Sequence, residues 1–157
     1  MAERSRCILL VDDDAQVLFV LRASLRRLSM PCDVAIALDG GEAYRLLQTN
    51  TFDLVVTAIR LPGLDGVTLT KFIRSTSHDL PVVWITAHGC APLRKDAARL
   101  GVYQCLEKPV EVSVFRKIVQ QALDGEAPDA NDGLASQGDR VAWPEEGRHE
   151  SSESRRP

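Results

Sequence analysis

Short apolar runs alternate with amphipathic stretches along the first 124 residues of the chain. Brief apolar runs are typical of buried strands, and apolar side chains recurring every three or four residues are typical of helices with one face in the core. Five strands and five helices follow one another in this way. Strands that alternate with helices indicate a parallel sheet with helices on both faces. The sequence therefore predicts a doubly wound α/β domain.

The expected elements can be placed by residue number. Strands are expected at 7–11, 32–36, 52–57 and 81–86, and a fifth within 102–107. The first helix should begin after an N-cap at Asp14, with Val17, Leu21, Leu25 and Leu28 on one face. The second helix should start near residue 41, the third should contain 69–73, and the last two should span 93–100 and 110–123.

Composition limits the classes of protein to consider. The chain has 157 residues, of which 45% are hydrophobic and 26% charged, a balance that suits one globular domain. No apolar run approaches the roughly 20 residues that a membrane helix needs, and no secretory signal is present. A cytoplasmic protein is expected. The net charge of −3 gives no basic footprint for nucleic-acid binding.

The last part of the chain differs from the rest. Residues 1–124 hold 15 basic and 14 acidic residues, whereas 125–157 hold 4 and 8, and the only large apolar residues there are Leu134, Val141 and Trp143. So few apolar side chains cannot offset the entropy of ordering the segment. We expect a domain at 1–124 and a flexible tail at 125–157. The tail is either a linker or solubilising segment, or carries a short docking motif around 141–144.

The cysteines give no sign of a metal or redox centre. They are far apart in sequence and form no CxxC pair, so reduced and mostly buried thiols are expected at Cys7, Cys32, Cys90 and Cys105.

Three consecutive acids follow the first strand. In a doubly wound sheet, ligands bind at the carboxyl ends of the strands, so this position is favourable for a site. Asp14 can cap the following helix, which leaves Asp12 and Asp13 crowded together. Their repulsion favours binding of a divalent cation, and carboxylates without His or Cys favour Mg²⁺ over zinc.

Two further polar residues follow later strands. Thr86 ends the fourth strand and Lys108 follows the fifth. A hydroxyl and an ammonium group at neighbouring strand ends could bind and neutralise a phosphoryl group held on the metal.

These segments resemble a bacterial response-regulator receiver domain, over essentially all of residues 1–124. The matching stretches are ILLVDDD, DLVVTAIRLPGLDG, PVVWITA and LEKPV. The resemblance implies a flavodoxin-like sheet of order 2-1-3-4-5. It also implies that Asp12, Asp13 and the backbone carbonyl of Arg60 hold Mg²⁺, that Thr86 is the switch hydroxyl and Lys108 the phosphoryl partner, and that the Lys108–Pro109 bond is cis.

The sequence departs from the family at the phosphoacceptor position, which is Ala58. A methyl group is not a nucleophile, so aspartyl phosphorylation is impossible, and neither Thr57 nor Ser75 is a credible substitute. Loss of a carboxylate should weaken Mg²⁺ binding and leave Lys108 to pair with Asp12 or Asp13. A second departure is Cys105, where receivers usually carry a switching Tyr or Phe.

Three functional interpretations remain open. The chain is a phosphorelay receiver inactivated at Ala58, a natural pseudo-receiver that acts by binding alone, or, far less favoured, a flavodoxin-like small-molecule binder. No segment after Asp124 is long enough for an output domain, so a stand-alone receiver and not an enzyme is expected. Its partners would be a histidine kinase or phosphotransfer protein, and a target docking on the face of the fourth helix, fifth strand and fifth helix. Neither nucleic acid nor membrane is expected as a partner.

Overall fold

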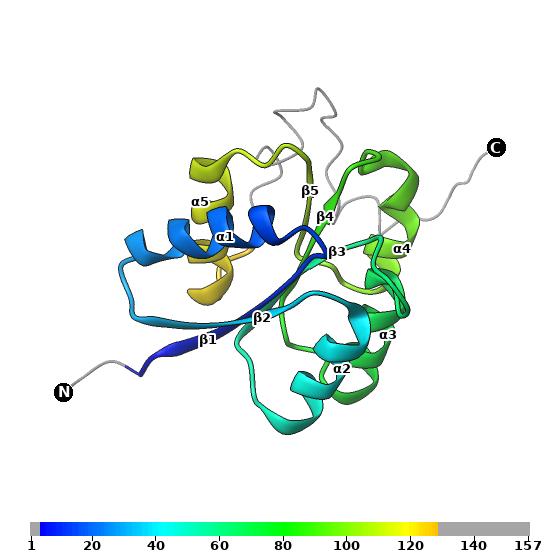
Figure 1. Cartoon of the computed structure of the whole chain (residues 1–157), viewed down its shortest axis with the longest axis horizontal. Coiled ribbons are helices and arrows are strands. Elements are labelled where there is room, and N and C mark those ends of the chain that lie inside the picture. The colour runs from blue at the N-terminus through cyan, green and yellow to red at the C-terminus, as the bar shows by residue number, and fades with distance from the viewer. Residues whose placement is uncertain (1–3, 129–157) are drawn as a thin grey trace.

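A parallel sheet of five strands forms the centre of the molecule, in the order β2-β1-β3-β4-β5 (Figure 1). The computed structural model describes residues 4–128. The strands are β1 (Arg6–Val11), β2 (Cys32–Ala37), β3 (Leu54–Ala58), β4 (Val82–Thr86) and β5 (Gln104–Glu107). The strand order confirms the predicted doubly wound, flavodoxin-like fold.

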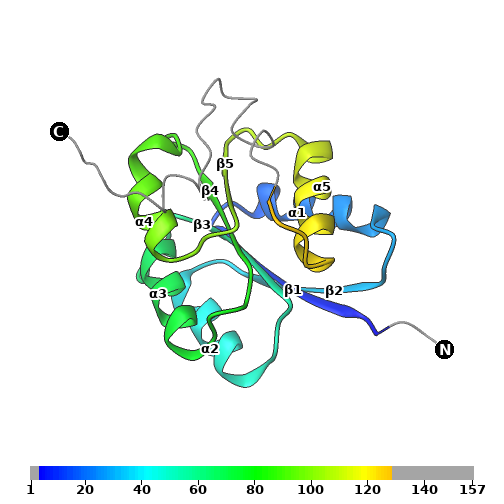
Figure 2. The ribbon, with the colours of Figure 1, turned by 180° about the vertical axis from the view of Figure 1, so that it is seen from behind.

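Helices cover both faces of this sheet. Helices α1 and α5 lie on one face and α2, α3 and α4 on the other, as the two opposite views agree (Figures 1 and 2). The helices are α1 (Ala15–Ser24), α2 (Gly40–Thr49), α3 (Gly66–Thr76), α4 (Arg94–Arg99) and α5 (Val112–Leu123), with single 3₁₀ turns η1 (Leu25–Arg27) and η2 (Ala91–Leu93).

The alternation of side chains along each strand divides the core into two layers. In β1, Ile8 and Leu10 pack under α1 and α5, whereas Leu9 and Val11 pack under the helices of the opposite face. Since both faces of the sheet are covered, every residue of β3 and β4 is buried. Trp84 of β4 is fully buried in the second layer, where its ring nitrogen donates to the Thr70 hydroxyl at 2.8 Å.

Aspartates fix where three of the helices begin. The side chain of Asp14 accepts the backbone N–H of Gln16 at 2.9 Å, and Asp39 and Asp65 cap α2 and α3 in the same way. Each carboxylate satisfies an N–H that the first helical turn leaves unpaired and lies at the positive end of the helix dipole. The predicted cap at Asp14 is therefore confirmed.

The first helix is shorter than its apolar pattern predicts. Helix α1 ends at Ser24, and Leu25 begins a 3₁₀ turn instead of continuing the helix to Leu28. The Ser24 hydroxyl donates to the Leu21 carbonyl at 2.7 Å, a bond that competes with the helical ladder. Leu25 is nevertheless buried, and Leu28 packs against the same core. The apolar pattern therefore predicted the burial of these residues correctly, but not their backbone conformation.

Other element boundaries also differ from the sequence prediction. The third strand begins at Leu54, two residues later than expected. Helix α4 has only six residues because Pro92 lies in a preceding 3₁₀ turn. Helix α5 begins at Val112, since the Glu111 side chain accepts the N–H of Ser113 and caps it there.

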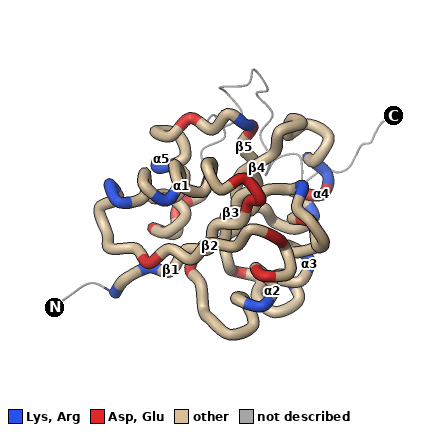
Figure 3. The backbone as a smooth tube through the Cα atoms, in the orientation of Figure 1, with Lys and Arg blue, Asp and Glu red and all other residues tan. Residues whose placement is uncertain are grey.

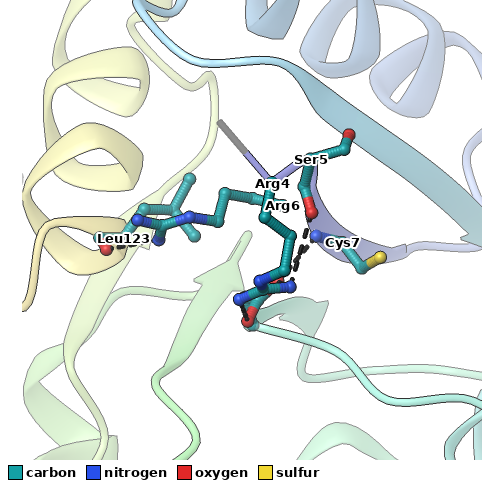
Figure 4. A network of polar contacts seen from close by, with 6 residues as sticks. Arg4, Ser5, Arg6, Cys7 and Leu123 are labelled. Atoms are coloured by element: carbon teal, nitrogen blue, oxygen red, sulfur yellow. Dashed lines mark hydrogen bonds and ion pairs between the residues drawn. The ribbon is translucent and has the colours of Figure 1, made fainter. Parts of the chain in front are cut away.

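Polar contacts at the start of β1 hold the first strand to β3 and α5 (Figure 4). The Arg4 guanidinium makes two bonds to the Asp53 carboxylate, at 2.9 and 3.2 Å, and Asp53 also accepts the N–H of Cys7 at 2.8 Å. Arg6 donates to the carbonyl of Leu123 at 2.6 Å. The hydrogen bond from Arg4 is the main cause that lowers the pKa of Asp53.

Asp53→Asn is expected to lower the urea midpoint of unfolding slightly at pH 7. A lowered folded-state pKa stabilises the fold above the unfolded value, about 3.9, and this gain is lost as the pH falls through the folded value. The difference between the two proteins should therefore shrink below about pH 4. Asp33→Asn, in the exposed part of β2, is the matched control and should leave the midpoint unchanged at both pH values. A difference that grows in acid would contradict this account.

Candidate functional site at the carboxyl edge of the sheet

The strand order brings four residues to one edge of the sheet. Asp12 directly follows β1, Ala58 ends β3, Thr86 ends β4 and Lys108 directly follows β5. In the strand pairing, Ala58 lies opposite Ile85 and Thr86 lies opposite Glu107. Figure 3 shows acidic residues gathered near the point where the central strands end and α1 begins. The predicted site residues thus belong to adjacent strand ends.

Asp12 is the buried charge of this edge. Its side chain is 2% exposed, and its Oδ1 accepts the N–H of Asp14 at 2.9 Å. The Lys108 ammonium lies 2.9 Å from Oδ2, as an ion pair. Within residues 4–128, Oδ2 receives no hydrogen bond of good geometry, so the ion pair is its only close polar partner there. Lys108 therefore pairs with Asp12, which was one of its two expected partners.

The three adjacent acids have separate environments. Asp12 is buried, Asp13 is exposed and Asp14 caps α1. The expected repulsion between Asp12 and Asp13 is relieved because Asp13 is exposed to solvent and Lys108 neutralises the buried Asp12. In the described part of the chain, no group of three or more His, Cys, Asp or Glu residues is arranged to hold a metal ion.

Ala58 is 3% exposed, and its backbone lies close to Gly66 at the start of α3. A Cβ on Gly66 would overlap the carbonyl oxygen of Ala58 and lie 3.0 Å from its carbonyl carbon. The same carbonyl oxygen accepts the Thr57 hydroxyl at 2.9 Å. Thr57 is fully buried and its hydroxyl is engaged, which agrees with the argument that it is no substitute nucleophile.

Backbone contacts join the ends of β4 and β5. The Thr86 hydroxyl accepts the N–H of His88 at 3.0 Å, and the Thr86 carbonyl accepts the N–H of Lys108 at 2.9 Å. The Lys108–Pro109 bond is cis, as the resemblance implies. The side chains of His88 and Arg60 are exposed and belong to the rim of this edge.

Sequence reasoning missed the role of Glu107. Its Oε2 accepts the N–H of Cys90 at 2.8 Å and ties the loop after β4 to the end of β5. Gly89, beside this carboxylate, has a φ of +88°, a backbone conformation that residues other than glycine rarely adopt. The sequence shows that an acid precedes the Lys108–Pro109 pair, but its spacing from Cys90 does not indicate that the two residues are hydrogen-bonded.

The cysteines lie partly as predicted. All four are free thiols, and Cys90 and Cys105 are fully buried, but Cys7 and Cys32 are only half-buried, so the expectation of mostly buried thiols was wrong for those two. Both lie at the amino ends of their strands, β1 and β2. Cys105 packs under α4, and a hydrogen bond with the Cys90 thiol, together with burial, raises the pKa of Cys105 strongly.

Comparison with known proteins decides the family. A family model described as the response regulator receiver domain matches residues 8–120. The chain belongs to this family. The fold of this receiver and the acidic residues at the carboxyl ends of its strands thus agree with the family resemblance seen in the sequence.

The curated relatives of the receiver are larger regulators. Over 128 residues it is 34% identical to the transcriptional regulatory protein GlrR of Escherichia coli, covering 82% of this chain and 28% of that protein. It is 33% identical over 124 residues to the response regulator protein PilR of Pseudomonas aeruginosa, covering 79% and 27%. The chain therefore spans about a quarter of the length of these two relatives.

Solved receiver structures cover the same region. The receiver domain of an HD domain-containing protein from Pseudomonas fluorescens is 30% identical with a TM-score of 0.70, over 78% of this chain and 97% of that one. A putative response regulator from Chloroflexus aurantiacus also gives 30% and 0.70, over 77% and 99%. Within residues 4–128, every helix is too short or too polar to cross a bilayer.

Proposed function

We propose that this chain is a receiver of a two-component phosphorelay that cannot accept a phosphoryl group in its present form. Ala58 would occupy the phosphoacceptor position. Its methyl group offers no lone pair to attack phosphorus, and neither Thr86 nor Lys108 is placed to replace it as a nucleophile. The roles of Thr86 as switch hydroxyl and Lys108 as phosphoryl partner are part of this proposal.

The ion pair between Lys108 and Asp12 is the observation that supports this proposal most. The ammonium lies 2.9 Å from a carboxylate that is 2% exposed. A buried carboxylate needs a partner, and here the lysine already provides it. The charges of Lys108 and Asp12 therefore neutralise each other without a third acid and without a phosphoryl group.

A magnesium ion fits this edge only weakly. Asp12, Asp13 and the backbone carbonyl of Arg60 would hold it. Oδ2 of Asp12 accepts no hydrogen bond within residues 4–128, and it would have to exchange the Lys108 ammonium for the cation. When bound, Mg²⁺ supplies positive charge to phosphoryl oxygens. Lys108 competes for the same oxygen. Because the affinity of an oxygen site for a cation rises with the number of carboxylate ligands, Mg²⁺ should bind more weakly here than in a receiver with three acids.

Partners follow from the family. A histidine kinase or phosphotransfer protein would be the upstream partner, and a protein target would dock on the face of α4, β5 and α5. Cytoplasmic location belongs to the same proposal. Cys105 is too small to act as a switching aromatic side chain, so any signal through this face would use shifts of backbone and helices.

A second candidate is a natural pseudo-receiver that binds its partner independently of phosphorylation. The ion pair between Lys108 and Asp12 fits this candidate equally well, because Lys108 has a partner without a phosphoryl group. The two candidates agree that position 58 is inert, and they differ in whether the rest of the pocket still works.

The native chain is expected to gain no phosphoryl group when incubated with acetyl phosphate and Mg²⁺. Intact-mass spectrometry measures the result directly, with a phosphorylatable receiver as positive control. Peptide mapping after the same treatment checks Thr57 and Ser75. A stoichiometric phosphoryl adduct on any residue of the native chain would overturn the proposal.

A further inference from the structure

An open apolar groove of about 460 Å³ lies between α1 and the connection from β5 to α5. Charged groups at its edge are Lys108 and Asp14. Ligand-binding pockets commonly measure about 300–1,000 Å³, so the groove has room for one large side chain and its neighbours. Its apolar lining consists of Val17, Val20 and Leu21 on α1, and Pro109 and Val110 on the connection.

Exposed apolar side chains extend this groove along α1. Among residues 4–128, the exposed large apolar side chains are Phe19, Val20 and Leu38, at 73%, 47% and 46%. Phe19 lies one helical turn after Gln16, which lines the groove, so the exposed ring stands beside it. Apolar surface that is continuous with a groove indicates a docking site.

The charge beyond the groove is positive. Arg22, Arg26 and Arg27 are exposed on the last turn of α1 and on η1, while Asp14 is the one acid between residues 14 and 28. Figure 3 shows the basic residues at the end of α1 that lies away from the acidic edge. A fitting occupant is therefore an apolar segment followed by acids.

The chain itself contains a segment with this pattern. The residues at 141–146 are Val-Ala-Trp-Pro-Glu-Glu, outside the described part of the chain. Two of the three large apolar residues beyond residue 128, Val141 and Trp143, lie within it. The acids Glu145 and Glu146 follow the tryptophan after one intervening proline.

The chain is also long enough to reach. Helix α5 begins two residues after Val110 and ends at Leu123, so its 12 residues lead away from the groove by about 18 Å. The 12 residues between Pro128 and Val141 can span about 40 Å when extended. A return path from the end of α5 to the groove is therefore available.

We propose that residues 141–146 dock in the groove between α1 and the β5–α5 connection, with the indole of Trp143 against Val17 and Val20. Glu145 and Glu146 then face the arginines of α1. Because a short tether gives a local concentration in the millimolar range, a contact with a dissociation constant near 1 mM suffices for about half occupancy. The docked segment covers α1 beside Lys108, so a partner that binds there must first displace it.

Fluorescence quenching of the full-length chain tests this proposal. Trp84 is fully buried and contributes the same protected emission throughout, so changes in acrylamide quenching report on Trp143. Val20→Gln removes one apolar wall of the groove, and we expect it to raise the quenching constant of Trp143 about twofold, as half occupancy implies. Leu38→Gln is the matched control, because Leu38 has the same exposure outside the groove, and it should change nothing.

A second measurement identifies the occupied surface. In amide NMR spectra of the full-length chain, Trp143→Ala should shift the signals of residues 17–21 and leave those of α3 unchanged. Trp143 quenched like a free indole in the native chain would overturn the proposal. NMR shifts confined to another face of the domain would also overturn it. So would protection of Trp143 from acrylamide that rises with protein concentration, since a second copy of the chain would then be the occupant. None of these readouts depends on phosphorylation, so failure here is distinct from failure of the proposed function.

Discussion

Ala58→Asp is expected to convert the chain into one that takes a full phosphoryl group from acetyl phosphate in the presence of Mg²⁺. The new carboxylate would end β3 between Asp12 and Thr86, at the edge where Lys108 already stands. It supplies the missing nucleophile and a third oxygen ligand for the cation. Intact mass against time measures the change, from no adduct in the native chain to one adduct per chain in the variant.

Two controls separate chemistry from folding in this experiment. Ala58→Asn has nearly the same size as the aspartate variant but no nucleophilic carboxylate, so it should gain no adduct. Chelation of Mg²⁺ should stop labelling of Ala58→Asp. If Ala58→Asp folds and binds Mg²⁺ yet gains no phosphoryl group, the pocket has lost more than its nucleophile, and the pseudo-receiver candidate is correct.

Gly66→Ala is expected to destabilise the domain by about 3 kcal/mol, at the upper end of what overpacking usually costs. The added Cβ would overlap the Ala58 carbonyl oxygen and lie 3.0 Å from the Cα of Ile59. These are backbone atoms at the end of β3 and of the residue that follows it, so they cannot rotate away as a side chain would. For a domain of this size, the melting temperature should fall by roughly 10 °C.

Gly41→Ala is the matched control, because it makes the same substitution in the first turn of another helix. Its nearest neighbour would be an Asp39 oxygen at 3.4 Å, an ordinary contact. Alanine favours helix over glycine, so this variant should be unchanged or more stable by up to about 1 kcal/mol. Equal melting temperatures for the two variants would show that α3 can move away from Ala58 at little cost.

The fold could be predicted almost entirely from the sequence, because it depends on burial. Runs such as Cys7–Val11 must be buried on both sides, and alternation with helices leaves few architectures that achieve this. The errors lie at the ends of elements, where burial does not decide. Ser24 ends α1 through a hydroxyl contact with Leu21, although Leu25 stays in the core.

The candidate site was predictable in its membership but not in its contacts. Parallel strand ends meet at one edge, so the sequence could place Asp12, Thr86 and Lys108 together. It could not tell that Lys108 pairs with Asp12 and leaves Asp13 exposed, since that depends on side-chain directions at one loop. Nor could it find the groove beside Val20, because an exposed apolar residue resembles a core residue in a sequence pattern.

The bond from Arg6 to the Leu123 carbonyl has a practical consequence for work on this protein. It holds the start of β1 against the end of α5. The chain therefore enters and leaves the domain at the amino ends of the strands, opposite Lys108. The strands between the two edges measure about 17–20 Å. A fluorescent reporter or affinity tag fused before Arg4 would therefore lie far from Asp12, Ala58 and Lys108, and it should not disturb the contacts of the candidate site.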